Sequence, residues 1–183
     1  MQFNFKKLNI LDVILIESKS FKDERGYFLE NFHQSVFEEN NIVTKFVQDN
    51  FSYSKKNVLR GLHFQKNPKA QAKFVSVLKG EIFDVAVDLR KNSPTYMKWV
   101  SEKLSDINHK SLYIPEGFAH GFCVLSNDAY VMYKVNSNFF PEFDSGIIWN
   151  DPELNISWPI SEPIISEKDK NLPLLKNQDS GFS

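Results

Sequence analysis

Residues 58–73 read Val-Leu-Arg-Gly-Leu-His-Phe-Gln-Lys-Asn-Pro-Lys-Ala-Gln-Ala-Lys, a stretch that sets a histidine and two cations into an apolar strand. Its apolar residues predict a strand as far as Phe64, Asn67-Pro68 predicts a turn, and residues 74–78 predict a second strand. We therefore expect a β-hairpin with polar groups at its rim. His63 has two interpretations, a hydrogen-bonded core histidine or a functional group whose charge changes near neutral pH. The neighbouring motifs have to distinguish them.

Composition limits the class of protein. The 183 residues suffice for one domain with a substantial core, and 42% hydrophobic against 25% charged residues is typical of a soluble globular chain. A net charge of −1 gives no overall attraction to nucleic acid or to an acidic membrane. The single cysteine, Cys123, excludes an intrachain disulfide. Without a signal peptide or a membrane-spanning stretch, we expect a cytoplasmic protein with one domain over residues 1–183 and no nucleic-acid or membrane partner.

Short strands with little helix between them indicate an antiparallel sandwich or barrel. The predicted strands are residues 13–17, 27–32, 46–54, 81–89, 99–104, 112–114 and 129–135. Alternation is cleanest in residues 81–89, where Asp84 and Asp88 share one face. Ser35 and Glu38 have the spacing of a capping box, so we expect a short helix over residues 35–40. The proline-rich sequence after residue 140 predicts an irregular tail that wraps the sheet.

Two histidine motifs bear on metal binding. Pro115-x-Gly117-x-x-His120 resembles the second signature of the cupin barrels. The first signature of metal-binding cupins is His-x-His followed by a carboxylate, whereas this chain has His63-Phe64-Gln65 and then Lys66. Catalytic zinc usually has three protein ligands, and the cation Lys73 would oppose a divalent ion. We therefore expect no metal ion.

Seven motifs in order together resemble the dTDP-4-dehydrorhamnose 3,5-epimerase family. They are Val-Leu-Arg60-Gly-Leu-His63-Phe-Gln, Ala-Gln-Ala-Lys73, Phe-Asp-Val-Ala-Val-Asp-Leu-Arg90, Ile-Pro-Glu-Gly-Phe-Ala-His120-Gly-Phe, Tyr133-Lys134, Trp149-Asn-Asp-Pro and Ile-Ser-Glu-Lys168-Asp169. The similarity extends over nearly the whole chain. It implies a mainly β fold, a cupin-type antiparallel β-barrel (jelly roll) with a few short helices.

The resemblance also implies a reaction. It is the cofactor-independent epimerisation of dTDP-4-dehydro-6-deoxy-D-glucose at carbons 3 and 5, where the adjacent carbon 4 ketone makes the protons acidic. By this resemblance His63 is the general base and Asp169 orients it. Lys73 stabilises the oxyanion, and Tyr133 returns a proton to carbon 5.

Each of these assignments has a structural alternative. Lys73 would be a solvated lysine at a strand edge, and Tyr133 a core tyrosine with a satisfied hydroxyl. Asp169 would be the acidic third position of a helix cap begun by Ser166. The joint pattern favours the functional assignment for all three.

The binding residues follow from the resemblance as well. Arg60 and the partner subunit's Arg25 hold the diphosphate, and the partner subunit also supplies Glu30 as a binding residue. Gln48, Asp49 and Asn50 lie along the nucleotide, although they also fit a solvated strand edge. His120, Asp144 and Lys168 complete the set of binding residues. Phe139 stands where the family usually has a tyrosine that stacks on thymine, and Asp144 where glutamate is common. The base preference is therefore less closely defined than the chemistry.

Two structural questions stay open at this point. Strict alternation puts Arg60 and His63 on opposite strand faces, so either Gly61 marks a bulge or Arg60 reaches round from the rim. Residues 27–32 carry more apolar surface than an exposed edge strand should, which favours a homodimer with a shared active site. The alternative is that this strand pairs within its own barrel and that Arg25 is a turn residue.

Three functional interpretations remain. The first is the double epimerisation described above. The second is an epimerase of a related 4-keto sugar nucleotide, including one that acts at carbon 3 only. The third is a non-catalytic cupin that binds sugar nucleotides, which we would expect to lack either His63 or Asp169, and this chain has both.

Overall fold

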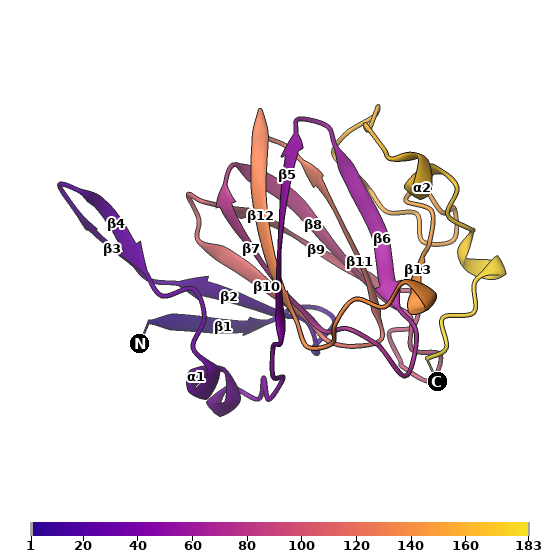
Figure 1. Ribbon diagram of the computed structural model, residues 1–183, viewed down its shortest axis with the longest axis horizontal. Helices are drawn as coiled ribbons and strands as arrows, with labels where there is room; N and C mark the ends of the chain where they lie inside the picture. Colours follow the sequence, from indigo (N-terminus) through magenta and orange to yellow (C-terminus); the bar gives the residue numbers. More distant parts are fainter. Residues whose placement is uncertain (1, 183) are drawn as a thin grey trace.

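The computed structural model describes residues 2–182, which form two antiparallel β-sheets and a separate hairpin (Figure 1). The six-stranded sheet has the order β1 (Phe3–Lys7), β2 (Ile14–Ser18), β10 (Lys110–Ile114), β7 (Lys73–Lys79), β12 (Asp128–Val135), β5 (Gln48–Lys55). The five-stranded sheet has the order β13 (Asp144–Gly146), β6 (Leu59–Gln65), β11 (Phe118–Val124), β8 (Glu81–Asp88), β9 (Trp99–Ser105). The hairpin consists of β3 (Ser20–Asp23) and β4 (Gly26–Leu29). The predicted mainly β, jelly-roll fold is confirmed, although each sheet keeps two edge strands and the barrel is not closed.

The main hydrophobic core lies between the two sheets. Val75 and Val131 of the six-stranded sheet pack in one cluster with Ile82 and Phe122 of the five-stranded sheet. The strands alternate, so every second residue of β7, β8, β11 and β12 points into this space. Any polar side chain at such a position is enclosed between the sheets.

The tail covers the outer face of the five-stranded sheet, which confirms the prediction that it wraps the sheet. Its Leu154, Leu175 and Phe182 pack against Val85 and Val87 of β8. Strand β8 is therefore buried on both faces. The tail contains the short helix α2 (Glu167–Lys170), which lies beside β6 in Figure 1, and a 3₁₀ turn at Leu175–Asn177. A second 3₁₀ turn, Pro141–Phe143, precedes β13.

The hairpin predicted for residues 58–78 is wrong. Strands β6 and β7 belong to different sheets, because β6 pairs with β13 and β11 while β7 pairs with β10 and β12. The turn at Asn67-Pro68 is real, since the Lys69 amide donates to the Lys66 carbonyl at 2.9 Å. It lies in a connection that crosses from one sheet to the other.

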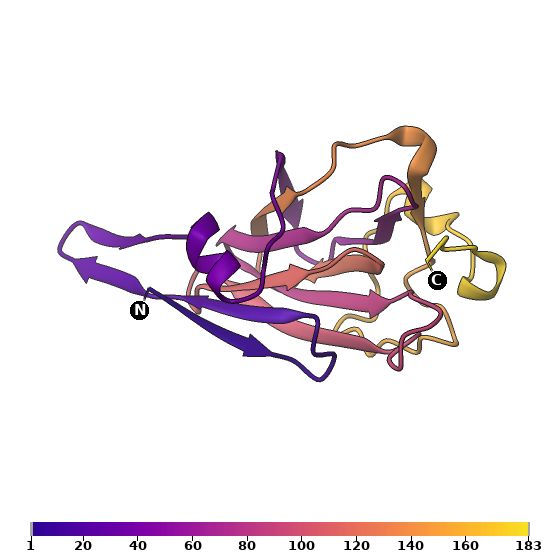
Figure 2. The ribbon, with the colours of Figure 1, turned by 90° about the horizontal axis from the view of Figure 1, so that it is seen from below.

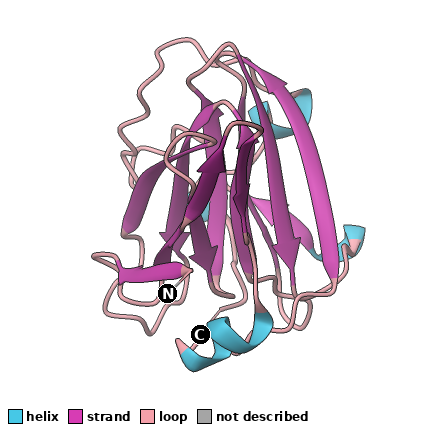
Figure 3. Ribbon diagram, turned by 90° about the vertical axis from the view of Figure 1, so that its left-hand side faces the viewer, coloured by secondary structure: helices cyan, strands magenta, loops and turns pink. Residues whose placement is uncertain are grey.

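The first helix is confirmed, but its predicted capping box is wrong. Helix α1 (Gln34–Glu39) has His33 as its N-cap residue, without a side-chain cap, so Ser35 lies inside the helix. Burial explains the register, because Phe37 is fully buried against Phe3 and Phe74 of the six-stranded sheet. The few helices lie at the periphery of the sheets (Figure 3), and no helix among residues 2–182 is long and apolar enough to cross a membrane.

The strand predicted over residues 27–32 is shorter in the structure, and it pairs in a hairpin rather than within the barrel. Strand β4 ends at Leu29 and pairs with β3 in the part of the chain that the structure describes. The hairpin extends away from both sheets (Figures 1 and 2), and Tyr27 and Phe28 are exposed on it.

Candidate active site

A β-bulge in β6 creates the site. His63 pairs with His120 of β11, and Arg60 pairs with Phe122, so three residue steps on β6 match two on β11. Gly61 has a φ of +123°, and a Cβ there would lie 2.5 Å from the Cα of Gly121. Only glycine fits this close approach of two strands. The extra residue brings Arg60 and His63 to the same cavity, and this answers the question about their faces in favour of the bulge.

His63 is joined to the only acidic side chain of α2 that is buried. Its Nε2 lies 2.8 Å from Oδ1 of Asp169, and the Asp169 Oδ2 accepts a hydrogen bond from the Gly61 amide at 3.1 Å. Burial alone would raise the pKa of Asp169, but the hydrogen bonds from His63 and Gly61 outweigh it and hold that pKa below its usual value. Ser166 does cap α2, since its Oγ accepts from the Asp169 amide, so Asp169 is both a cap position and the partner of His63.

Lys73 and Tyr133 face His63 from the opposite sheet. Both come from the six-stranded sheet, and all three side chains line the same two adjoining cavities. Lys73 is buried rather than a solvated edge residue, and burial lowers its pKa to about 8. Its Nζ donates to the His63 carbonyl at 3.3 Å. Burial raises the pKa of Tyr133, so its hydroxyl holds a proton at neutral pH.

Arg60 and His120 line the inner part of this space. The Nε of Arg60 donates to Ser54 Oγ at 2.9 Å, and one terminal nitrogen, Nη2, donates to the Tyr53 carbonyl at 3.2 Å. His120 is buried and its Nε2 lies 2.7 Å from Oδ1 of Asp84. Burial lowers the pKa of His120, although Asp84 opposes this effect.

The outer part of the space has an amide-rich wall. Gln48 and Asn50 of β5 point into it and are hydrogen-bonded to one another at 2.8 Å. Gln48 also accepts a hydrogen bond from the Phe139 amide at 3.2 Å. Phe139 is about half exposed at the mouth, so its ring is free to stack on a planar ligand.

Asp144 and Lys168 close the opposite side of the mouth. Asp144 lies in β13 and Lys168 in α2, next to Asp169, and the two form an ion pair. Both line the outer cavity. This pair links the strand and the helix that flank the His63–Asp169 pair.

Three predicted binding residues lie outside the cavities of this chain. Asp49 alternates to the other face of β5 and pairs with Lys134 at 2.9 Å. Arg25 sits at the tip of the β3–β4 hairpin and pairs with Asp23 at 2.7 Å, while Glu30 lies 3.1 Å from His33. Apart from His63, thirteen site residues were predicted. The structure brings ten of them together around His63 and places Asp49, Arg25 and Glu30 elsewhere.

Three polar residues at the site, Gln65, Ser52 and Asp84, were not predicted as site residues from the sequence. Gln65 is buried, and its amide binds the Lys69 and Asn138 carbonyls and the Phe140 amide, so it anchors the loop that carries Phe139. Ser52 shares the inward face of β5, and its buried hydroxyl has no partner within residues 2–182. Asp84 is described above. Period-two alternation along β5 gave the signal for Ser52. The burial of β8 on both faces was not readable from the sequence.

Gln65 also bears on metal binding. In metal-binding cupins a histidine occupies this position, whereas here the amide is engaged with three backbone groups. Within residues 2–182 no cluster of three or more histidine, cysteine, aspartate or glutamate side chains is placed to hold a metal ion.

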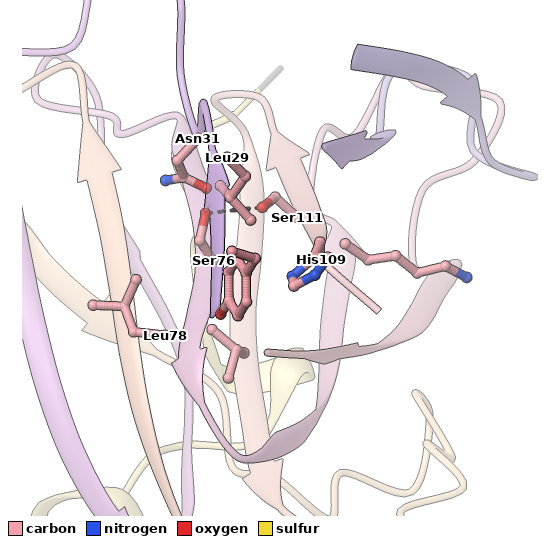
Figure 4. Close-up of a pocket in the computed structure, with 9 residues that line it drawn as sticks. Leu29, Asn31, Ser76, Leu78, His109 and Ser111 are labelled. Carbon is pink, nitrogen blue, oxygen red and sulfur yellow. Dashed lines mark hydrogen bonds between the residues drawn. The ribbon is translucent and has the colours of Figure 1, made fainter. Parts of the chain in front are cut away.

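A separate cavity lies at the base of the hairpin (Figure 4). Leu29 and Asn31 lie near Ser76, Ser111 and His109 there, and Ser76 and Ser111 share a hydrogen bond of 2.9 Å. None of the predicted site residues lines it. The acid–base groups therefore belong to the cavities around His63.

A jelly roll that encloses a histidine–aspartate pair, a lysine and a tyrosine defines the class of cupin-type isomerases that work by acid–base chemistry. The model of the family described as dTDP-4-dehydrorhamnose 3,5-epimerase matches residues 7–177. The chain belongs to this family.

Individual relatives agree with this assignment. The dTDP-4-dehydrorhamnose 3,5-epimerase of Methanothermobacter thermautotrophicus is 52% identical, with 96% of this chain and 97% of that protein covered. The crystal structure of dTDP-6-deoxy-D-glucose-3,5-epimerase from Legionella pneumophila, in complex with dTDP-4-keto-L-rhamnose, has a TM-score of 0.93 at 47% identity and covers 97% of this chain and 95% of its own. A dTDP-4-dehydrorhamnose 3-epimerase from Streptomyces niveus is 38% identical, with 97% and 86% covered.

Proposed function

We propose that this chain converts dTDP-4-dehydro-6-deoxy-D-glucose to dTDP-4-dehydro-L-rhamnose by epimerisation at carbons 3 and 5, a step in the formation of dTDP-L-rhamnose. The observation that carries the proposal is the placement of His63, with Asp169 behind it, across one cavity from Lys73 and Tyr133. Relatives at about half identity are named for this reaction.

His63 acts as the general base. Its Nε2 is held by Asp169, so Nδ1 is the nitrogen that takes a proton from carbon 3 or carbon 5. The anionic partner stabilises the imidazolium that forms. The proton remains on His63 until it returns to the enolate or exchanges with water.

Lys73 stabilises the enolate. Removal of the proton next to the ketone moves negative charge to the carbon 4 oxygen, and a buried ammonium meets that charge without reorganisation. A lysine with a pKa of about 8 is largely protonated at neutral pH, so the charge is available.

Tyr133 supplies the opposing acid. Inversion at carbon 5 requires a proton from the face opposite to the base, and Tyr133 comes from the sheet opposite to the one that carries His63. Its raised pKa keeps the hydroxyl protonated before transfer.

The outer cavity takes the nucleotide. Phe139 stacks on the base, Gln48 and Asn50 provide amide donors and acceptors, and Arg60 reaches the diphosphate. His120 binds the sugar. Asp144 and Lys168 line the mouth and hold the nucleotide by polar contacts. No cofactor is needed for this chemistry.

The working unit is a homodimer with a shared site. Arg25 lies on a hairpin that extends from the end of the sheets remote from α2 and β13, so it cannot reach its own cavity (Figure 1). The hairpin exposes Tyr27 and Phe28, and the outer face of β5 exposes Phe51 and Tyr53. Pairing of two copies would bury these apolar groups, bring Arg25 to the neighbour's diphosphate site and place Glu30 in the neighbour's binding site.

Asp49 takes part only indirectly in this proposal, through Lys134 and the outer face of β5. We place the protein in the cytoplasm, where the single buried Cys123 stays reduced.

The test is incubation with dTDP-4-dehydro-6-deoxy-D-glucose in D₂O, followed by NMR of the sugar. We expect deuterium at carbons 3 and 5 and the L-rhamno product. Deuterium at carbon 3 alone would favour the monoepimerase interpretation, and no exchange at either carbon would favour a non-catalytic sugar-nucleotide-binding protein.

A further inference from the structure

Asp84 is a charged residue in the middle of the fold. It lies on β8 with its side chain between the two sheets and has no exposed surface. One carboxylate oxygen, Oδ1, lies 2.7 Å from Nε2 of His120. The other, Oδ2, is buried and has no hydrogen-bond partner within residues 2–182. A buried carboxylate in this state is costly, so its position calls for a compensating charge.

Lys73 provides that charge. It is buried in the same interior, and the attraction of Asp84 raises the pKa of Lys73 against burial, which lowers it to about 8. Without Asp84 the ammonium would be less stable still. The titratable and charged groups that interact with Lys73 and Asp84 from the surrounding strands are His63, His120, Tyr133, Arg60, Asp144 and Cys123.

Asp84 also determines which ring nitrogen of His120 carries the proton and which is available to a ligand. The carboxylate accepts from Nε2, so Nε2 carries the proton, and burial keeps the imidazole neutral by lowering its pKa. Nδ1 is then an acceptor. An acceptor suits a sugar hydroxyl, whereas an oxyanion needs the donor that Lys73 supplies.

We propose that Asp84 is a positioning residue of this site, which holds His120 in the Nε2–H tautomer and keeps Lys73 as an ammonium ion. The cavity then presents one acceptor and one cation to the sugar. The inference rests on the proposed function, since it assigns the two groups to the hydroxyl and the carbonyl oxygen of a keto sugar.

The first test needs no substrate. The pKa of Lys73 is measured by NMR of [¹³Cε]lysine, with the resonance assigned by its loss in Lys73→Gln. Asp84→Asn should lower this pKa by roughly one unit or more, because an opposite charge has been removed from a buried site. An unchanged Lys73 pKa in folded Asp84→Asn would overturn the proposal.

A matched control comes from the same strand. Asp88 is also fully buried on β8, but its carboxylate is bonded to Arg90, Ser93 and Thr95 rather than to site residues. Asp88→Asn removes the same charge from the same strand and should leave the Lys73 pKa unchanged. An equal shift in both variants would point to a general structural effect and contradict the proposal.

The tautomer is tested in the unaltered protein. The ¹⁵N shifts of His120 at pH 7.5 should report Nε2–H, and an Nδ1–H tautomer or an imidazolium would overturn that part. Asp84→Ser, which removes the charge without adding volume, replaces Asp84→Asn if the latter does not fold.

Turnover gives the last readout. The alkaline limb of kcat should lie near pH 8 and move to lower pH by about one unit or more in Asp84→Asn, with kcat at pH 8 reduced by about fivefold or more. An alkaline limb at the same pH in Asp84→Asn and in the unaltered protein would contradict the proposal. If the unaltered protein shows no epimerisation, the proposed function fails while the NMR measurements still decide the role of Asp84.

Discussion

At the scale of single residues, two histidine–aspartate pairs share one cavity and have different environments. The His63 side chain is 31% exposed to the cavity, with Asp169 behind it. The His120 side chain is 7% exposed, and Asp84 is fully buried. An imidazole that reaches the cavity can gain a charge more easily than one that is desolvated on all sides. The first pair is therefore suited to proton transfer and the second to binding.

Substitution of Tyr133 tests whether the two sheets supply different groups, a base from one and an acid from the other. Tyr133→Phe should retain proton exchange at carbon 3 but reduce inversion at carbon 5 by about 10²–10⁴-fold, since loss of general acid assistance has that magnitude. NMR of products formed in D₂O measures both positions. Tyr130→Phe, at an exposed position of the same strand, is the control and should behave as the unaltered protein. Equal losses at both carbons in Tyr133→Phe would contradict its assignment to carbon 5.

Asp169 should contribute stability that depends on pH. Its pKa in the folded state lies below the unfolded value, so its contribution is complete above the unfolded pKa and is lost as pH falls through the folded pKa. Asp169→Asn should therefore lower the free energy of unfolding at pH 7 by about 1–3 kcal/mol, a typical value for hydrogen bonds to a charged group. Urea unfolding at pH 7 and at pH 3 checks this. A difference that does not shrink at pH 3 would argue against a charge-dependent role.

At the scale of elements, the site depends on a bulge and a four-residue helix. Gly61 brings Arg60 and His63 to one face, and α2 presents Asp169 to His63. Sequence patterns predicted most strands and the tail, because alternation and turn residues are local properties. The cluster around His63 was predicted from the resemblance to the family. The patterns did not predict that β6 and β7 separate into different sheets, since strand pairing depends on contacts remote in sequence. For the same reason Asp84 was not recognised as a site residue.

The caps of the two helices give a matched pair of variants. Ser166 Oγ accepts the Asp169 amide at 3.1 Å, whereas Ser35 lies within α1 and does not cap it. Ser166→Ala should cost about 1 kcal/mol of stability and lower kcat, because α2 holds Asp169. Ser35→Ala should change stability by less than about 0.5 kcal/mol. Thermal unfolding and turnover measure both, and equal effects would show that the Ser166 cap has no special role.

At the scale of the whole molecule, we propose that one chain does not complete its own site. Its cavities contain the acid–base groups, but Arg25 and Glu30 lie on or beside a hairpin that leaves the body of the fold (Figure 2). An exposed hairpin with aromatic side chains is a liability for an isolated protein. Exchange of hairpins between two copies would both cover the aromatic residues and complete each site.

Complementation tests the shared site. Arg25→Ala and His63→Ala are each expected to be inactive, and their mixture under conditions of subunit exchange should recover activity. Heterodimers would contain one site with both residues intact, so recovery approaches about one quarter of the unaltered activity for random exchange. Absence of recovery, despite exchange demonstrated by mass spectrometry, would place Arg25 in its own subunit's site or outside any site.

We infer that His63 is the base for both carbons, and deuterium uptake by His63→Ala measures this role. The variant and the unaltered protein are incubated with dTDP-4-dehydro-6-deoxy-D-glucose in D₂O, with His109→Ala, from the separate cavity at the hairpin, as the control. We predict that folded His63→Ala loses exchange at carbons 3 and 5 together by at least about 10²-fold, while the control exchanges normally. Exchange at the unaltered rate at either carbon in folded His63→Ala would contradict this inference.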